Sequence, residues 1–448
     1  MTTHQPSVAS HRSPAVVIGG GIAGLTAAAL LGRAGVPAVV LEQSATAGGR
    51  AATRDRNGFL FNLGPHALYR AGALMQTLQT LGVEVRGQVP GTSGGFALHG
   101  GRLHTLPVGL TSLLTTGLLS LAGKFELARL QPKLMLVDTN PIQSQPLAAW
   151  LDANVSDAGV RAVVEMLVRV TSFTNDPAGQ SAGAAIDQLQ LALKASVLYL
   201  DGGWQTIVDG LRRAAIDSGG RLVTGAQAVG VERDVVRLSD GRVLPAAGVI
   251  IAAGPAEVDS LVGTGFQSTL PPPIRLATLD VALRSLPKPA ATVAFGIDVP
   301  LYFSVHSAVA RLAPEGGALI HVSKYLQPGE HTGATVEREL EALMDTMQPG
   351  WRTVVESRQF LPSLRVTNAE VTAAQGGLAG RPPAQLPMFD NVAIAGDWIG
   401  PRGQLSDAAA SGAADAVAQV MAGLKARATS EGSEPVSPGF RPAVKAAS

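Results

Sequence analysis

The sequence predicts an α/β fold in two domains: a parallel sheet flanked by helices, and an α+β domain formed by insertions into it. Three observations lead to this expectation. A strand, a glycine-rich turn and a helix follow one another at residues 15–34. Strand-like runs of the same buried character recur near residues 250 and 392. The chain of 448 residues is also longer than one hydrophobic core usually supports.

The composition narrows the class of protein. Hydrophobic residues make up 46% of the chain and charged residues 15%, which is typical of a well-packed globular protein. The net charge of +1, without a block of Lys or Arg, argues against a nucleic-acid partner. The absence of cysteine excludes disulfides, thiolate catalysis and Cys-ligated metals. We therefore predict no metal site and expect redox chemistry to come from a bound cofactor.

The chain start lacks the apolar core of a signal peptide, so residues 1–13 are predicted to be a flexible leader and the protein to be cytoplasmic. The most apolar stretch, Leu106 to Ala122, is interrupted by Gly, Thr and Pro and is too short to span a bilayer. Two interpretations of this stretch remain open. It is either a buried or interfacial helix, or an apolar patch that makes peripheral contact with a membrane.

The first structural unit is a βαβ crossover. Ala15 to Ile18 is a short apolar strand, and an Ala- and Leu-rich helix follows the glycine turn as far as Ala34. Gly35 ends this helix because glycine readily adopts the left-handed conformation of a helix cap. A second strand, Ala38 to Leu41, completes the unit, and a right-handed crossover makes the two strands parallel.

Two later runs have the same character. The middle run predicts an amphipathic helix through Ile207 and Ala215, followed by several strands and a hairpin about Asp240-Gly241. The strands are Arg221 to Thr224, Ala228 to Glu232 and Val249 to Ala252, and the hairpin is Val235 to Leu244. The last run predicts a strand, Asn391 to Ile394, and a closing helix from about Ser406 to Met421.

These runs set the predicted domain boundaries. The cofactor domain is expected to be discontinuous, with a hairpin or meander beside its parallel sheet, and it comprises residues 14–87, 200–265 and 387–425. The two insertions between these segments, residues 88–199 and 266–386, are expected to form one substrate domain. Residues 426–448 are rich in Ser, Pro, Glu and Lys without periodicity and are predicted to be a disordered tail.

The glycine turn has the spacing of a Rossmann-like dinucleotide site. In this pattern Gly19 permits the tight bend, Gly21 lets the backbone approach a pyrophosphate, and Gly24 lets the helix pack on the strand. Ile22 and Ala23 lie in the first helical turn, whose free N–H groups and positive dipole attract phosphates. The sequence therefore predicts a dinucleotide in this turn.

An acidic residue at the expected distance strengthens this prediction. Glu42 ends the second strand 18 residues after Gly24, close to the roughly 20 residues expected of the acid that accepts the ribose hydroxyls. Gln43 follows it and is expected to lie at the same site. An acid at this position, instead of an arginine, argues against a 2′-phosphorylated adenosine.

Four further motifs resemble the superfamily of flavin amine oxidases, phytoene dehydrogenases and protoporphyrinogen oxidases, and the phytoene-dehydrogenase-like members most of all. They are Gly48-Gly49-Arg50, Phe61 to His66, Asp201 to Gln205 with Val229 beyond it, and Ala395 to Trp398 with Ser411-Gly412. As a set they lie at both ends and in the middle of the chain. The resemblance implies that the dinucleotide is FAD.

The resemblance also implies which residues hold FAD. The residues in question are Gly48, Gly49 and Arg50 along the pyrophosphate and flavin, Gly64, Pro65 and His66 beside the isoalloxazine, Val229 at the adenine, and Gly396, Asp397 and Leu405 near the ribityl chain and the closing helix. That helix would direct its N-terminal N–H groups toward the flavin and stabilise negative charge on the reduced ring.

Candidates for substrate chemistry are fewer. His66 and Tyr69 are predicted beside the flavin, where His66 either accepts a proton, holds a flavin hydrogen bond or is purely structural. Two strand-like runs, Leu301 to Leu312 and Ala318 to Tyr325, each place polar side chains on one face, and His306 and Tyr325 are candidate substrate contacts. Strand register decides whether these faces coincide and line a cavity or face solvent. Lys324 lies on the opposite face.

The expected reaction is transfer of a hydride from a C–H bond of an apolar substrate, such as an isoprenoid-like molecule, to flavin N5. No second dinucleotide motif is found, so oxygen or a quinone-like molecule is the expected electron acceptor. One alternative is an amine oxidase acting on a C–N bond, although Leu361 to Phe389 contains no Tyr or Trp for an aromatic cage. Another is a non-catalytic prenyl or lipid carrier of the same fold, which retention of Glu42 and Asp397 disfavours.

Overall fold

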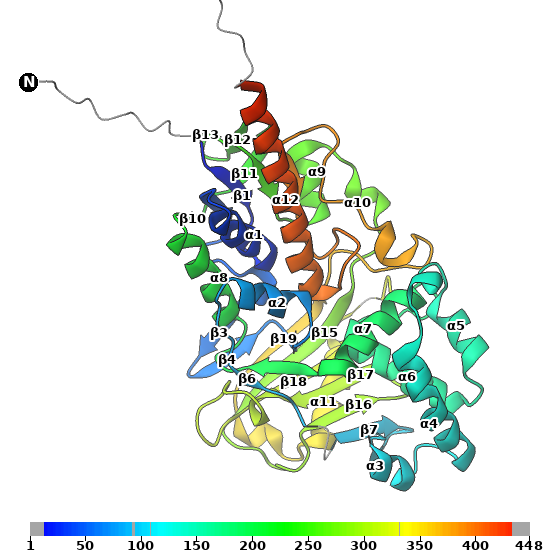
Figure 1. The fold of residues 1–448 in the computed structure, drawn as a ribbon. Helices are drawn as coiled ribbons and strands as arrows, with labels where there is room; N and C mark the ends of the chain where they lie inside the picture. The colour runs from blue at the N-terminus through cyan, green and yellow to red at the C-terminus, as the bar shows by residue number, and fades with distance from the viewer. Residues whose placement is uncertain (1–12, 92–94, 108, 331, 432–448) are drawn as a thin grey trace, which may run out of the picture.

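The computed structural model describes residues 13–91, 95–107, 109–330 and 332–431. Figure 1 shows a domain with a parallel sheet and its helices above a large mixed sheet that carries helices of its own. The predicted α/β fold, with an α+β part formed by insertions, is confirmed. Residues 1–12 of the predicted leader and 432–448 of the predicted tail lie outside the described residues.

A five-stranded parallel sheet brings together three distant parts of the chain. Its order is β10-β2-β1-β14-β20. The strands are β1 (Ala15–Ile18), β2 (Ala38–Glu42), β10 (Arg221–Thr224), β14 (Val249–Ile251) and β20 (Val392–Ile394). Every residue of β1, β2, β14 and β20 is buried, as expected for a parallel sheet covered on both faces.

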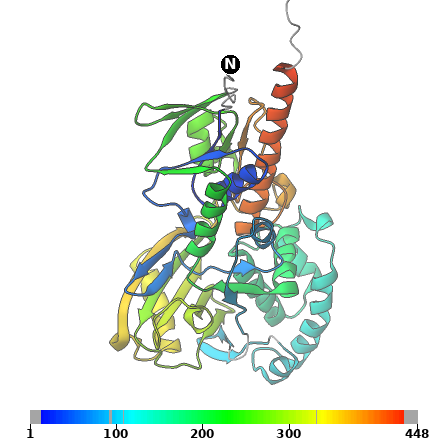
Figure 2. The same ribbon diagram turned by 60° about the vertical axis from the view of Figure 1, so that its left-hand side comes forward.

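Helices cover this sheet. They are α1 (Ile22–Arg33), α8 (Gln205–Asp217) and α12 (Leu405–Glu431), and α1 packs between the other two. Figure 2 shows α12 running along the length of the domain. A small antiparallel meander, β11 (Ala228–Glu232), β12 (Val235–Leu238) and β13 (Val243–Pro245), forms a separate sheet beside α9 (Pro255–Val262), as the hairpin prediction required.

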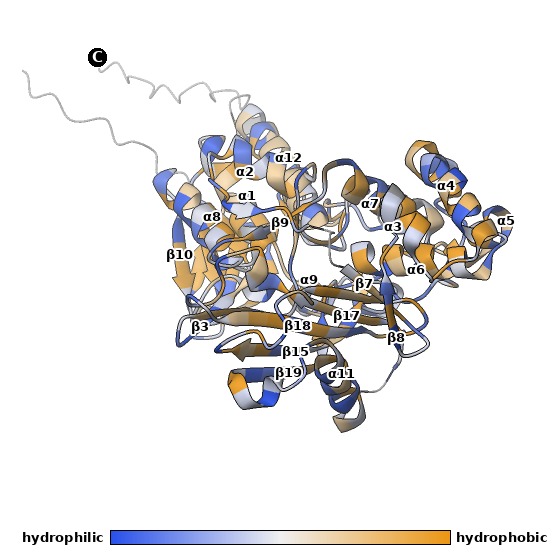
Figure 3. Ribbon diagram, turned by 90° about the horizontal axis from the view of Figure 1, so that it is seen from below, coloured by the Kyte–Doolittle hydropathy of each residue, from blue (hydrophilic) through white to orange (hydrophobic). Residues whose placement is uncertain are grey.

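A seven-stranded mixed sheet forms the second layer, in the order β19-β15-β18-β17-β16-β7-β8. Its strands are β7 (Gly95–His99), β8 (Arg102–Thr105), β15 (Arg275–Leu283), β16 (Val293–Gly296), β17 (Leu301–Val305), β18 (Ala318–Tyr325) and β19 (Val355–Arg365). Both insertions contribute to it. Figure 3 shows α11 (Ala334–Met347) on one face and the remaining helices and the parallel-sheet domain on the other.

The first insertion also supplies a helical cluster. Its members are α3 (Leu110–Thr115), α4 (Leu121–Leu136), α5 (Leu147–Asn154), α6 (Ala158–Ser172) and α7 (Ala182–Ala195). Asp157 accepts hydrogen bonds from the first turn of α6, and Ser181 accepts one in α7, so ordinary N-caps fix where these helices start. Short elements join the layers: β3 (Thr53–Arg56), β4 (Phe59–Asn62), β5 (Leu68–Tyr69), α2 (Ala73–Thr80), β6 (Gly87–Gln88), β9 (Val197–Leu200) and α10 (Phe266–Thr269).

The apolar stretch from Leu106 to Ala122 is not one buried helix. It contains α3, a turn and the start of α4. Leu106 and Leu119 are buried, whereas Leu114 and Leu121 are 64% and 71% exposed. Among the described residues, no helix combines the length and apolar character needed to cross a bilayer.

The closing helix is longer than predicted. The expected end at Met421 is wrong, and so is the expected start of a tail at residue 426, because α12 continues to Glu431. Residues 422–431 consist largely of helix-forming Ala, Leu, Lys, Arg and Glu. Arg427 in this extension also pairs with Asp234 at 2.5 Å, which ties the extension to the turn between β11 and β12.

We expect Gly412 to be essential to how α12 docks. A Cβ at this position would lie 3.0 Å from the carbonyl oxygen of Gly396. Gly412→Val should therefore lower the free energy of unfolding by about 1–3 kcal/mol through overpacking. Ala418→Val, on the exposed side of the same helix, should change it by less than about 0.5 kcal/mol. Equal thermal midpoints of the two variants, followed by circular dichroism, would contradict this packing.

Candidate active site

The glycine turn closes tightly around its own backbone. Gly19 has a φ of +106°, and a Cβ on it would lie 2.4 Å from the carbonyl oxygen of Ala252. A Cβ on Gly24 would lie 1.9 Å from the carbonyl oxygen of Gly19. Gly21 is the N-cap residue of α1, and it has no side chain that could accept hydrogen bonds from the first turn of the helix. The first N–H groups of α1 are thus open to an anionic ligand, as a pyrophosphate requires.

Glu42 lies directly behind this turn. Its Oε2 accepts a hydrogen bond from the backbone N–H of Gly20 at 2.7 Å, and its Oε1 accepts one from Ser44 at 2.8 Å. The side chain is buried, and both oxygens keep a lone pair for a further donor. The carboxylate is therefore held in place beside the glycine turn with capacity for further donors.

An ion pair joins the two ends of the chain. The Arg50 guanidinium donates to Asp397 Oδ2 at 2.7 Å and to the carbonyl oxygen of Val366 at 2.5 Å. Asn368 donates to the same carboxylate from its backbone N–H at 3.2 Å and from Nδ2 at 2.7 Å. Arg50 and Asp397 are 347 residues apart in sequence, so only the folded chain brings them together.

The start of α12 reaches the same place. Leu405 has a φ of +54°, and Leu405, Ser406 and Ala409 lie on the wall of the cleft described below. The buried Asp407 accepts a hydrogen bond from the backbone N–H of Leu74 at 2.8 Å, which fixes α12 against α2. Burial raises the pKa of the Asp407 carboxyl to about 6.

These elements enclose one cleft of about 730 Å³. The predicted site residues that line it are Gly19, Gly21, Ile22, Ala23, Glu42, Gln43, Gly48, Gly49, Arg50, Pro65, His66, Gly396, Asp397 and Leu405. The predicted residues outside its lining are Gly24, Gly64, Tyr69, Val229, His306 and Tyr325. Gly24 instead provides the close packing of helix on strand, and Val229 directly follows Ala228, which lines the cleft.

Several lining residues were not identified from the sequence. They are Phe173, Ala226 to Ala228, Ala252 to Gly254, Glu257, Leu276, Leu364 to Val366 and Asn368. Most come from the insertions or from loops after strands of the parallel sheet. Ligands of such sheets bind beyond the carboxyl ends of the strands, so the ends of β10 and β14 were the available signal.

His66 is a neutral ring held at both nitrogens. Nδ1 lies 3.1 Å from the carbonyl oxygen of Gly64, and Nε2 lies 3.1 Å from that of Arg50. Burial lowers the pKa of the imidazole, so the neutral form is favoured and only one of these contacts has a proton to donate. The unprotonated nitrogen therefore faces a carbonyl oxygen and would donate to it if the ring took up a proton. The ring also packs on Trp204, with centroids 5.0 Å apart.

Tyr69 points away from the cleft. Its hydroxyl donates to the carbonyl oxygen of Thr171 at 2.6 Å, and burial raises its pKa. The predicted place beside the flavin is therefore not where the structure puts this side chain. Its hydrogen bond ties β5 to the C-terminal end of α6.

The polar faces of β17 and β18 coincide. Tyr302 pairs with Ser323 and Ser304 pairs with His321 across the two strands. The polar side chains of both runs are buried, so the expectation that they face solvent is wrong. They line no part of the cleft. The face is buried because the β5–β9 region covers it, as the 3.0 Å contact between the Tyr199 and Tyr302 hydroxyls shows.

This buried face is bonded internally. His321 Nδ1 lies 2.6 Å from Asp280 Oδ1, and both side chains are fully buried. His306 contacts the Tyr302 hydroxyl through Nε2 at 3.4 Å, and Tyr325 is buried behind Leu276. Lys324, on the opposite face, pairs with Glu339 at 2.9 Å and is held away from the cleft.

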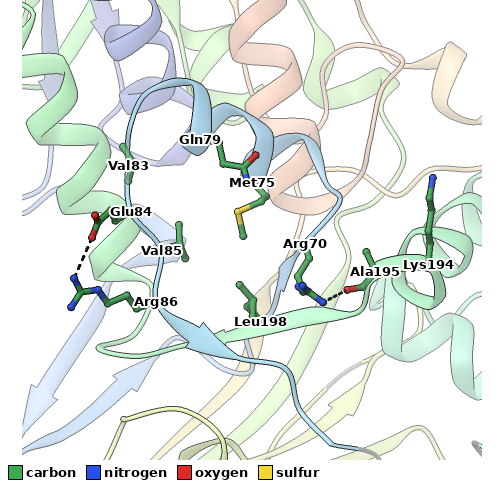
Figure 4. A pocket seen from close by; sticks show the side chains of 10 residues that line it. All are labelled: Arg70, Met75, Gln79, Val83, Glu84, Val85, Arg86, Lys194, Ala195 and Leu198. Atoms are coloured by element: carbon green, nitrogen blue, oxygen red, sulfur yellow. Dashed lines mark hydrogen bonds and ion pairs between the residues drawn. The ribbon is translucent and has the colours of Figure 1, made fainter.

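A second hollow of about 780 Å³ lies elsewhere, between α2, β6 and the C-terminal end of α7. Figure 4 shows Arg70, Arg86 and Lys194 around it, with Arg86 paired to Glu84 and Arg70 bonded to Ala195. The predicted site residues do not line it, and these charged side chains are exposed. It is a solvated surface groove.

The cleft fits a dinucleotide. At one end it offers the free N–H groups of α1 and the carboxylate of Glu42. At the other end it offers Arg50, Asp397 and the N-terminus of α12.

A family model described as flavin containing amine oxidoreductase matches residues 22–292, which is more than half of the chain.

The chain belongs to this family. It is an oxidoreductase whose cofactor is FAD. Human protoporphyrinogen oxidase is 41% identical over 111 residues, which cover 22% of this chain and 23% of that enzyme. The chain thus matches less than a quarter of the length of this curated relative.

A broader match is coproporphyrinogen III oxidase of Propionibacterium freudenreichii. The two sequences are 26% identical, and the match covers 78% of this chain and 81% of that enzyme. Among solved structures, an oxidoreductase from Methanosarcina mazei superposes with a TM-score of 0.71 at 20% identity, over 91% of this chain and 99% of that one. At this identity the likeness shows the shared fold.

We expect Glu42→Ala to weaken FAD binding by about tenfold or more, because hydrogen bonds to a charged acceptor contribute about 1.5–3 kcal/mol each. The measurement is a titration of flavin-free protein with FAD, followed by fluorescence quenching. Glu232→Ala is the matched control, since Glu232 is exposed at the end of β11 and pairs only with Arg237 among the described contacts. If both variants bind FAD equally, the ribose assignment of Glu42 is wrong.

Proposed function

We propose that the chain removes a hydride from a C–H bond of an apolar substrate, of the porphyrinogen or isoprenoid type, and passes the electrons to oxygen or a quinone-like acceptor. Bound FAD supplies the chemistry by accepting the hydride at N5. The observation that carries the proposal is the apolar wall at the His66 end of the cleft. That wall consists of Leu63, Ala67, Phe173, Leu276 and Leu364.

Apolar walls suit this reaction. Hydride transfer needs a positioned C–H bond and the exclusion of water more than it needs acids and bases. Both nitrogens of His66 face backbone carbonyl oxygens, and the protonated one donates to Gly64 or to Arg50, so the proposed part of His66 is to hold the ring and this loop in place. Arg50 and Asp397 then fix the cofactor end of the cleft.

The names of the matched relatives support the same class of substrate. Protoporphyrinogen and coproporphyrinogen are macrocycles that lose hydrogen in the reactions for which those relatives are named. Amine oxidation is the weaker alternative, because Leu361 to Phe389 contains no aromatic pair and Leu364 projects into the cleft. The carrier alternative does not explain why Glu42, Arg50 and Asp397 all line the cleft.

We expect porphyrinogens, or an isoprenoid polyene precursor, to bleach the flavin of the anaerobic holoprotein, whereas benzylamine and putrescine do not. The measurement is the loss of visible flavin absorption after rapid mixing. Bleaching by the amines alone would overturn the proposal. A protein that retains no FAD after incubation with it and removal of the unbound flavin would also overturn the proposal, because that result favours the carrier.

A variant of the apolar wall sharpens this test. Leu364→Ser should lower kcat/KM for the active substrate by about tenfold, because burying a leucine contributes about 1.5–3 kcal/mol. FAD affinity should not change. Leu364→Met keeps the volume and apolar character of the side chain and should retain activity. A Leu364→Ser enzyme as active as Leu364→Met would remove the assignment of this wall to the substrate.

We also propose that the α3–α4 corner touches a membrane surface. It exposes Leu114, Leu121 and Phe125, at 64%, 71% and 66%. Exchanging all three for Ser should lower sedimentation with lipid vesicles severalfold, because each lost apolar side chain weakens insertion. Leu136→Ser, at the far end of α4, removes a leucine that is even more exposed, at 83%, and should have little effect. Equal loss in both variants would indicate nonspecific adsorption.

A further inference from the structure

A small cavity near the cleft of Glu42 and Asp397 is lined by carboxyl groups. It has a volume of about 200 Å³ and lies where the loop after α6, the start of β15 and the loop after β18 meet. Asp176, Glu330 and Glu370 lie on its walls, and Arg275 is the one cation among the described residues that line it. The balance of charge is therefore negative.

Glu370 is the exceptional member of this set. Its side chain is 4% exposed, and Oε1 is enclosed without any hydrogen-bond partner among the described residues. Its backbone N–H donates to the carbonyl oxygen of Pro272 at 2.9 Å, which fixes its position at the cavity wall. A buried carboxyl without a partner costs free energy, and a donor placed in the cavity would recover it.

The other charged side chains do not neutralise Glu370. Arg275 donates from Nη1 to the backbone and side-chain oxygens of Ser363, at 3.1 and 3.2 Å. Glu330 is already satisfied, because its carboxylate lies 3.1 Å from Lys324 Nζ and accepts from the backbone N–H of Gln327 at 3.0 Å. Asp176 accepts from the N–H of Gly179 at 3.1 Å and adds negative charge to the cavity.

Some donors in the walls are absent or already used. Pro272, Pro273 and Pro328 line the cavity and have no backbone N–H. The Nδ2 donor of Asn175 is directed to the carbonyl oxygen of Tyr325 at 3.1 Å. Three carboxyl groups against one guanidinium favour a ligand that is positively charged and donates hydrogen bonds.

The size and ligand set point to an organic cation. The cavity is far larger than the roughly 10–15 Å³ that one water needs. Among the described residues, no group of three or more acidic or His side chains is arranged to hold a metal ion. We propose that this cavity binds the primary ammonium group of a small organic amine, with Glu370 and Asp176 as its acceptors. The proposal does not depend on the reaction assigned to the cleft.

The charge state of Glu370 couples ligand binding at this site to the release of a proton. Burial, together with the nearby Asp176, raises the pKa of the Glu370 carboxyl to about 8. The carboxyl is thus largely protonated at neutral pH, and a bound ammonium group favours the ionised form. Binding near pH 7 should therefore release a proton, and affinity should rise as the pH rises through about 8. Asp176, Arg275 and Glu330 are the other charged groups facing the cavity.

The test uses the FAD-loaded protein and n-propylammonium chloride. Isothermal titration near pH 7, in two buffers with different heats of ionisation, measures affinity and proton release together. We expect saturable binding with net proton release, and no binding of propionate. Titration heats that do not depend on the buffer, or tighter binding of propionate, would overturn the proposal without any variant.

Two variants locate the site. Glu370→Gln keeps the shape of the side chain and should weaken n-propylammonium binding by about tenfold or more and abolish the proton release, since one charge-assisted hydrogen bond is lost. Glu330→Gln is the matched control in the same cavity, and it should bind like the unmodified protein because Glu330 is already paired. Unchanged binding by Glu370→Gln, or an equal loss in both variants, would refute the assignment.

Discussion

The hydrogen-bonded order of the parallel strands governs the rest of this structure. β1 lies between β2 and β14, and β14 pairs with β20, so three segments separated by long insertions end at one edge of a single sheet. The glycine turn follows β1, Glu42 ends β2, and Gly396 and Asp397 follow β20. Because parallel strands deliver their carboxyl ends to the same edge, the pairing brings the glycine turn, Glu42 and Asp397 to one side of the cleft.

Close backbone contacts fix the positions of the chain segments at that edge. Gly19 and Gly24 leave no room for side chains where the first turn passes Ala252, and Gly412 lets α12 lie against Gly396. The Arg50–Asp397 ion pair then links the N-terminal and C-terminal parts of the wall. Arg50 also donates to the carbonyl oxygen of Val366, the residue that directly follows β19. This contact fixes the Arg50–Asp397 end of the cleft relative to β19.

The mixed sheet has a different character on its two faces. One face packs Leu, Val and Ile side chains against α11. The other face carries a buried polar layer that includes Asp280, His306 and His321, satisfied in part by hydrogen bonds within the layer. Such a layer is stable only where partners are supplied locally. The apolar part of the cleft and the carboxyl-lined cavity lie at the end of this sheet, at neighbouring positions of the same chain segments.

Local chemistry determined much of this protein from the sequence alone. Short-range patterns predicted the strands of the parallel sheet, the meander, the glycine turn and Glu42, because each depends on residues a few positions apart. Only the tertiary structure decided that Tyr69 turns to Thr171, that the β17–β18 face is buried, and that Oε1 of Glu370 has no hydrogen-bond partner among the described residues. It also extended α12 to Glu431 through a pairing with Asp234. These outcomes depend on what packs against a side chain from distant segments, which alternation and spacing along the chain do not record.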